Sequence, residues 1–118
     1  MCRMVQYSDG NYVADIKINH LKNISKHDES CGNITKIILF GSSLEERCTN
    51  RSDIDIAVFG KQTKGKYLLS KEYMEFRKRL FQYDMEQDYD ILYFEDGKIY
   101  TDRIMQDIDK GVELYRRA

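Results

Sequence analysis

The segment Ile38–Gly60, with the sequence ILFGSSLEERCTNRSDIDIAVFG, holds two apolar runs separated by a polar stretch. The first run ends at Gly41–Ser42, and after ten intervening residues the triplet Asp53–Asp55 leads directly into the second run. Short continuous apolar runs are typical of strands that are covered on both faces. The segment therefore predicts a strand, a glycine turn and a second strand that begins with two carboxylates.

The length and composition of the chain limit the classes of function. With 118 residues we expect one domain, residues 1–118. The net charge of −1 gives no electrostatic footprint of a nucleic-acid or membrane-binding protein, so we expect neither partner. No apolar run is long enough to span a membrane and no signal-peptide core is present, which predicts a cytoplasmic protein. The three cysteines lack metal or disulfide spacing, and we expect reduced thiols.

Hydrophobic spacing along the rest of the chain predicts an alternating order of helices and strands, hence the α/β class. The expected helices are residues 11–28, 42–48, 69–83 and 104–115, and the expected strands are residues 37–40, 53–59 and 89–94.

The two carboxylates at the second strand point to a metal ion. Side chains alternate along a strand, so Asp53 and Asp55 share a face, roughly 7 Å apart along the chain. Like charges this close repel each other unless a cation lies between them, and Mg²⁺ is held by such carboxylates together with substrate phosphates. If the strand at residues 89–94 is the neighbour, Asp90 completes a three-carboxylate centre. Asp88 shares its face, but we expect it to be solvated.

The turn before the polar stretch is suited to a phosphate. Glycine at position 41 lets the backbone approach a ligand closely. The free amides of Ser42 and Ser43, at the start of the expected short helix, would bind a phosphate group.

This combination of Gly41, Ser42, Asp53, Asp55 and Asp90 resembles the minimal nucleotidyltransferases (MNT) of the polymerase-β superfamily. The resemblance implies a polymerase-β-type nucleotidyltransferase fold, with a small mixed sheet flanked by helices. It implies that the aspartates hold Mg²⁺ and that the Gly-Ser pair grips the triphosphate of ATP. It also implies that the third aspartate helps to activate an acceptor hydroxyl.

Proteins that resemble this chain in size and motif are typically MNT antitoxins paired with a HEPN toxin. The resemblance therefore implies transfer of AMP to a tyrosine of a partner toxin, within a homo- or hetero-oligomer. We also expect a macromolecular acceptor because a short chain has no second domain to enclose a small one.

One departure from the family pattern keeps alternatives open. Family members continue Gly-Ser with Arg-x-Arg-Gly, whereas this chain has Ser43–Glu46, SLEE, and Arg47 or Arg51 is the candidate replacement for the phosphate-binding arginine. The acidic pair favours a catalytically degenerate antitoxin that acts by binding alone. A small-molecule, antibiotic-type nucleotidyltransferase is a further alternative.

For two other groups of polar side chains, the histidines and the lysines of one loop, we expect packed or solvated positions and no role in the site. His20 and His27 lack ligand spacing, and we expect packed or solvated histidines. The lysines of GKQTKGK, residues 60–66, fit a solvated loop better than a polyphosphate site.

Overall fold

The computed structural model of the chain describes residues 2–26 and 32–117. In chain order its elements are β1 (Met4–Ser8), β2 (Asn11–Ala14), the 3₁₀ helix η1 (Asp15–Lys17), α1 (Ile18–Ser25), β3 (Ile34–Phe40), the 3₁₀ helix η2 (Gly41–Leu44), β4 (Ile54–Gly60), α2 (Lys64–Leu68), α3 (Lys71–Tyr83), β5 (Tyr89–Glu95), α4 (Ile104–Asp109) and β6 (Val112–Arg116).

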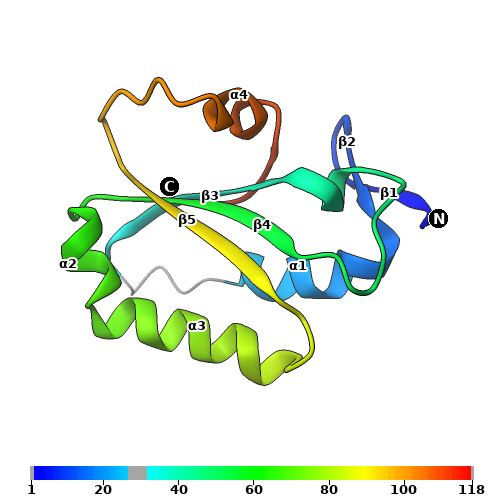
Figure 1. Cartoon of the computed structure of the whole chain (residues 1–118), viewed down its shortest axis with the longest axis horizontal. Coiled ribbons are helices and arrows are strands. Elements are labelled where there is room, and N and C mark those ends of the chain that lie inside the picture. The colour runs from blue at the N-terminus through cyan, green and yellow to red at the C-terminus, as the bar shows by residue number, and fades with distance from the viewer. Residues whose placement is uncertain (1, 27–31, 118) are drawn as a thin grey trace.

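Four strands form one mixed sheet with the order β5-β4-β3-β6 (Figure 1). β3 runs antiparallel to both of its neighbours, β4 and β6, whereas β4 and β5 are parallel. A parallel pair needs a crossover connection, and here α2 and α3 supply it. The small mixed sheet flanked by helices confirms the fold class that the sequence predicted.

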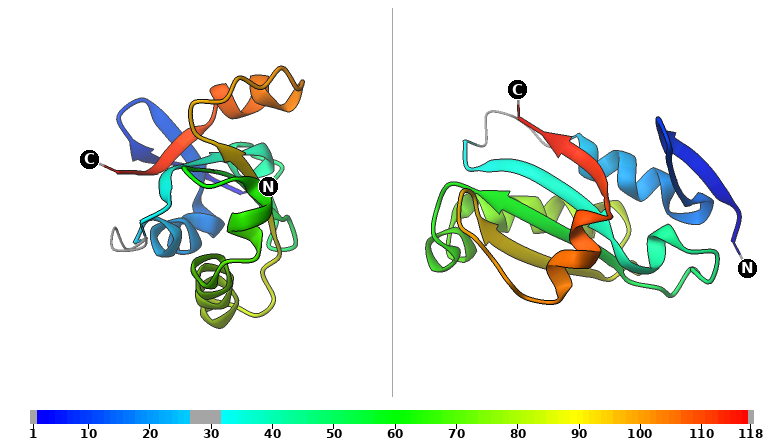
Figure 2. Two further views of the ribbon diagram at one scale, coloured as in Figure 1. Left: turned by 90° about the vertical axis from the view of Figure 1, so that its left-hand side faces the viewer. Right: turned by 90° about the horizontal axis from the view of Figure 1, so that it is seen from above.

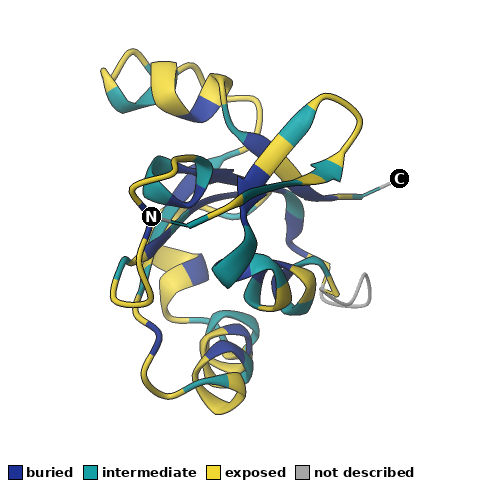
Figure 3. Ribbon diagram, turned by 90° about the vertical axis from the view of Figure 1, so that its right-hand side faces the viewer, coloured by how far each residue is buried: buried dark blue, intermediate teal, exposed yellow. Residues whose placement is uncertain are grey.

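Two apolar layers cover the two faces of the sheet. α1 and α3 lie on one face and α4 lies on the other (Figures 1 and 2). Side chains of β4 alternate between the layers: Ile54, Ile56 and Val58 belong to the α1/α3 layer, and Ala57 and Phe59 belong to the α4 layer. Buried residues accordingly concentrate in the sheet and on the inner sides of the helices (Figure 3).

The N-terminal part of the expected first helix is a strand. Residues 11–14 form β2, which pairs with β1 in a hairpin at one end of the molecule (Figure 2), and α1 begins only at Ile18. The turn contains Asp9-Gly10, with Gly10 at φ 74°, a conformation that glycine adopts readily. Val13 fitted the helical spacing because a single buried residue is compatible with either period. α1 ends at Ser25, and the expected end at residues 27–28 lies outside the described residues. Gly32, the expected glycine stop, lies in the turn before β3.

The expected last helix also ends early. α4 stops at Asp109, and residues 112–116 form β6, which pairs with the outer edge of β3. A Cβ atom on Gly111 would lie 2.3 Å from the carbonyl oxygen of Leu39, so only glycine allows the chain to pass this close to β3. Pairing with the open edge of β3 satisfies backbone groups that a helix would have left exposed there.

The other expected elements are present with shifted bounds. The three predicted strands correspond to β3, β4 and β5, and α3 begins at Lys71, where the Ser70 hydroxyl accepts a hydrogen bond from the Tyr73 amide at 3.1 Å. The expected helix at 42–48 is only the 3₁₀ turn η2, and α2 was not predicted. No helix within the described ranges has the length and apolar composition needed to cross a membrane.

Candidate functional site

The structure brings Asp53, Asp55 and Asp90 to one face of the sheet. Asp55 and Asp90 are directly paired across the parallel β4–β5 ladder. Because side chains alternate along each strand, Asp53 and Asp55 lie on the same face as Ala57, and Asp90 lies on the same face as Phe94. This is the face covered by α4. β4 and β5 are therefore neighbours, which is the condition that the sequence argument for Asp90 required.

Burial and the neighbouring carboxylates both raise the pKa of Asp55, the central carboxylate. Asp55 is partly buried, and burial raises the pKa of its carboxyl group. The negative charges of Asp90 and Asp53 raise this pKa further. The site therefore holds excess negative charge that a cation or a proton would relieve.

The Gly-Ser turn lies directly against this carboxylate. Gly41 has φ 81°, and a Cβ atom at this position would lie 2.2 Å from Oδ2 of Asp55. The Ser42 hydroxyl donates a hydrogen bond of 3.5 Å to the carbonyl oxygen of Asp53. Glycine is thus required here both for its backbone conformation and for the close approach of Asp55.

The other two residues predicted to bind nucleotide have different surroundings. Ser43 is fully buried, and its hydroxyl has no hydrogen-bond partner among the described residues. Arg47 lies on the exposed loop and forms an ion pair with Glu45, two residues away. The guanidinium of Arg47 is therefore engaged by one of the two glutamates that distinguish this loop from the family pattern.

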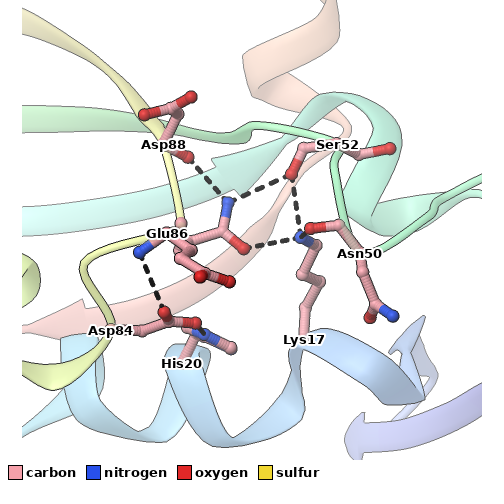
Figure 4. A network of polar contacts seen from close by, with 8 residues as sticks. Lys17, His20, Asn50, Ser52, Asp84, Glu86 and Asp88 are labelled. Atoms are coloured by element: carbon pink, nitrogen blue, oxygen red, sulfur yellow. Dashed lines mark hydrogen bonds and ion pairs between the residues drawn. The ribbon is translucent and has the colours of Figure 1, made fainter.

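A buried lysine that the sequence analysis did not select joins the segments before β4 and β5 (Figure 4). Lys17 is 1% exposed, and its Nζ donates to the carbonyl oxygens of Asn50 and Ser52, at 3.3 and 2.8 Å, and to Oε1 of Gln87 at 2.6 Å. Burial lowers the pKa of Lys17. All three acceptors are uncharged, so the ammonium group is satisfied by hydrogen bonds instead of by an ion pair.

Gln87 extends this network between the two strands. Its Nε2 donates to the carbonyl oxygens of Ser52 and Asp88, at 3.0 and 2.7 Å (Figure 4). The Asp88 carbonyl oxygen also accepts from the Ile54 amide at 3.0 Å. The polar contacts therefore fix the start of β4, next to Asp53, against the start of β5, next to Asp90.

A second contact from the same helical segment holds the turn between α3 and β5. His20 Nε2 and Asp84 Oδ2 are 2.8 Å apart, and Asp84 Oδ1 accepts from the Glu86 amide at 3.0 Å (Figure 4). The hydrogen bond from His20 lowers the pKa of Asp84. His20 is therefore a packed, hydrogen-bonded histidine, as the sequence predicted, whereas His27 lies outside the described residues.

The signal that could have identified Lys17 is its place in the apolar pattern. Lys17, Leu21 and Ile24 follow helical spacing, and all three are buried. A lysine in an apolar stripe is almost never fully buried unless acceptors surround it. No comparable signal distinguishes Gln87, because its burial depends on the turn after α3.

The remaining polar residues lie apart from the site. Asp88 is exposed and precedes β5. Lys61, Lys64 and Lys66 follow the far end of β4, roughly 20 Å along the strand from Asp53. Their exposure and position agree with solvated side chains and not with a polyphosphate contact, but Lys64 and Lys66 lie in α2, so the expected loop ends at Thr63. Cys2 and Cys48 are free thiols, and Cys31 lies outside the described residues.

The carboxylates of Asp53, Asp55 and Asp90 are ligands of the kind that a hard divalent cation prefers. In the part of the chain that the structure describes, no three His, Cys, Asp or Glu side chains are already grouped closely enough to hold a metal ion. However, Asp53, Asp55 and Asp90 offer carboxylate oxygens on one face, and carboxylates are the ligands that Mg²⁺ prefers. In chemistry, the donor set fits Mg²⁺.

Comparison with known proteins agrees with this geometry. Residues 19–118 match the family described as polymerase beta, nucleotidyltransferase. The chain belongs to the polymerase-β nucleotidyltransferase family. Nucleotidyl transfer is the general activity of this family, and the matched residues include the Gly-Ser turn and all three aspartates. The β1–β2 hairpin and Lys17 precede the matched range. A search of curated proteins found no match to the chain.

We predict that Gly41→Ala destabilises the protein more than Gly97→Ala. Both glycines have φ 81°, but only a Cβ at position 41 meets another residue. Gly97→Ala should cost about 1 kcal/mol for its backbone conformation, and Gly41→Ala at least about 1 kcal/mol more. Chemical denaturation measures both. In an Asp55→Ala background, which removes the carboxyl group but keeps a Cβ atom 3.3 Å away, the difference should become much smaller. An undiminished difference would contradict the assigned contact.

We predict that Asp55→Asn keeps or raises the stability of the metal-free protein at neutral pH. The raised pKa means that the folded chain binds this proton more tightly than the unfolded chain. Wild-type stability should therefore fall as the pH rises from the ordinary value of 3.8 through the raised pKa, and the variant should lack this fall. Denaturation curves between about pH 4 and 8 test this, with Asp88→Asn as the control. A marked loss of stability in Asp55→Asn at pH 7 would contradict the assigned repulsion.

We predict that Lys17→Met loosens the starts of β4 and β5. The substitution keeps the apolar stem but leaves buried oxygens without their donor, which should cost about 1–3 kcal/mol of unfolding free energy. The Ile54 amide, which donates a hydrogen bond to the Asp88 carbonyl oxygen, should show faster hydrogen exchange than in the wild type. Lys22→Met, on the exposed side of α1, is the matched control. Equal effects of the two substitutions would show that the Lys17 contacts do not hold these strands.

Proposed function

We propose that this chain, as one domain over residues 1–118, transfers AMP from ATP to a hydroxyl group, with Mg²⁺ as cofactor. The acceptor is a tyrosine of a partner HEPN toxin, and the modification makes the chain an antitoxin in the cytoplasm. The single observation that carries the proposal is the placement of Asp53, Asp55 and Asp90 on one sheet face beside the Gly41 turn. Clustered carboxylates destabilise a protein that has no cation to bind there, so a purely structural role does not explain them.

Each residue of the site has a role in the proposal. Asp53, Asp55 and Asp90 would hold Mg²⁺, and the bound ion would neutralise charge on the phosphates during the transfer. The Gly41 turn, with Ser42 and the buried Ser43, would receive the triphosphate close to the backbone.

Asp90 would also face the acceptor. It is the exposed member of the pair that spans β4 and β5. Its carboxylate would take the proton of the tyrosine hydroxyl while the hydroxyl oxygen forms a bond to the α-phosphorus and pyrophosphate departs. Catalysis would otherwise consist of positioning the two reactants.

A second candidate function rests on the loop after the Gly-Ser turn. The Arg47 guanidinium is paired with Glu45 and is therefore not free to contact a phosphate in this arrangement. An antitoxin that has lost turnover and neutralises its partner by binding alone would show this feature. A small-molecule nucleotidyltransferase would differ from both of these functions because its acceptor is a small molecule and not a protein.

We predict Mg²⁺-dependent transfer of label from α-labelled ATP to the product of a neighbouring gene. Mass spectrometry of the co-expressed pair should show an added AMP on a tyrosine, and the Asp53→Asn, Asp55→Asn double variant should lack it. Complex formation without label would support the binding-only antitoxin. Label on an aminoglycoside, with none on any co-purifying protein, would support the small-molecule enzyme.

The two acids of β5 provide a matched control for this experiment. Asp90→Asn should lower kcat about a hundredfold or more while nucleotide binding changes less, since a proton acceptor acts on the chemical step. Asp88→Asn should change both quantities little. Comparable losses in the two variants would show that Asp90 is not the specific base.

A further inference from the structure

The outer surface of α2 and α3 carries an unusual share of exposed apolar side chains. Of the eight large hydrophobic residues that are exposed in the described ranges, six lie between positions 68 and 85. Leu69, Met74 and Phe81 are 89, 68 and 57% exposed. Apolar side chains that gather on one surface mark an interaction site more often than scattered ones.

Four of these six side chains line a groove along α3: Leu68, Leu69, Met74 and Phe81. The groove has a volume of about 540 Å³, and its walls include Leu69, Met74 and Phe81 together with Arg77 and Lys78. A second hollow of about 180 Å³ shares Arg77 and Phe81 and continues to Asp88 and Tyr89 at the start of β5. The hollowed surface therefore extends from the α2–α3 junction to the strand that carries Asp90.

The charges of the groove identify the chemistry of its occupant. The only charged residues in its walls are Arg77 and Lys78, and neither forms an ion pair with another described residue. Arg77 lies over the ring of Tyr73, 5.6 Å from its centroid, at the edge of the apolar surface. A partner with carboxylates beside an apolar face would complement this arrangement, whereas a second copy would bring two more cations to the same place.

The spacing of the apolar residues favours a helical occupant. Met74 and Phe81 are seven residues apart, about 10 Å along the α3 axis. A partner helix presents apolar anchors at this interval at its positions i and i+7, with i+3 or i+4 between them. The groove also follows α3, so a partner helix can pack along it.

We infer that the groove of α2 and α3 is a docking site for an amphipathic helix of a partner protein whose apolar face is flanked by acidic residues. The identification of this partner as the nucleotide acceptor rests on the proposed function, but docking itself requires no nucleotide. The site is on the α1/α3 side of the sheet edge, so a docked partner leaves the carboxylates on the opposite face accessible.

The test uses two labelled helical peptides with the same leucine anchors, one flanked by glutamates and the other by lysines. Fluorescence anisotropy, without nucleotide, should show binding of the acidic peptide and at least tenfold weaker binding of the basic one. Phe81→Ser should weaken binding of the acidic peptide tenfold or more, and the Arg77→Glu, Lys78→Glu double variant should reverse the preference. Ile99→Ser, at a more exposed apolar site outside the groove, should have no effect.

Three results would overturn the inference. They are equal binding of the two peptides, no binding of the acidic peptide up to ~1 mM, and binding that Phe81→Ser leaves unchanged. Sedimentation velocity adds a fourth: a dimer that Phe81→Ser dissociates would assign the groove to a second copy. The Asp53→Asn, Asp55→Asn variant should bind the acidic peptide normally, so a failure of the proposed transferase activity is distinguishable from a failure of docking.

Discussion

The parallel pairing of β4 with β5 is the constraint on which the site depends. The register places Asp55 directly opposite Asp90, and a shift by one residue would move Asp90 to the other face of the sheet. The isoleucines of β4, together with Ile91 and Tyr93 of β5, fix this register, because they must all face the apolar layer under α1 and α3. Core packing thus aligns carboxylates that repel each other, and burial of the apolar residues offsets that repulsion.

Hydrogen bonds also hold the starts of β4 and β5 in position. Lys17 reaches from the η1–α1 segment to the loop before β4 and, through Gln87, to the start of β5 (Figure 4). A buried ammonium group is unfavourable unless each of its donors finds an acceptor, and here three oxygens provide them. The network therefore permits few alternative positions of the two loops. It extends the structural support of the site beyond the residues that match the family.

The N-terminal hairpin lies outside the residues that match the family, but it contacts the Gly-Ser turn. The family match begins in α1 and accounts for the sheet, the Gly-Ser turn and the aspartates. The hairpin precedes it, and β2 contacts η2, the turn that contains Gly41. Cys2 also donates its amide hydrogen to the Glu46 carbonyl oxygen at 3.1 Å. The loop that departs from the family pattern is therefore held by a segment outside the family match.

The sequence by itself determined the strands β3, β4 and β5 and the long helix α3, because these depend on local periodicity. It also selected five candidate site residues at the turn and the strand starts from their spacing. It did not determine β2 or β6. Val13 and Val112 fit helical spacing, and only pairing with β1 and with the edge of β3 decides their conformation. The tertiary structure alone placed Asp55 opposite Asp90, Asp55 against Gly41, and Lys17 among its three acceptors. These contacts join residues far apart in the chain, and their geometry follows from the packing of the sheet and not from any local pattern.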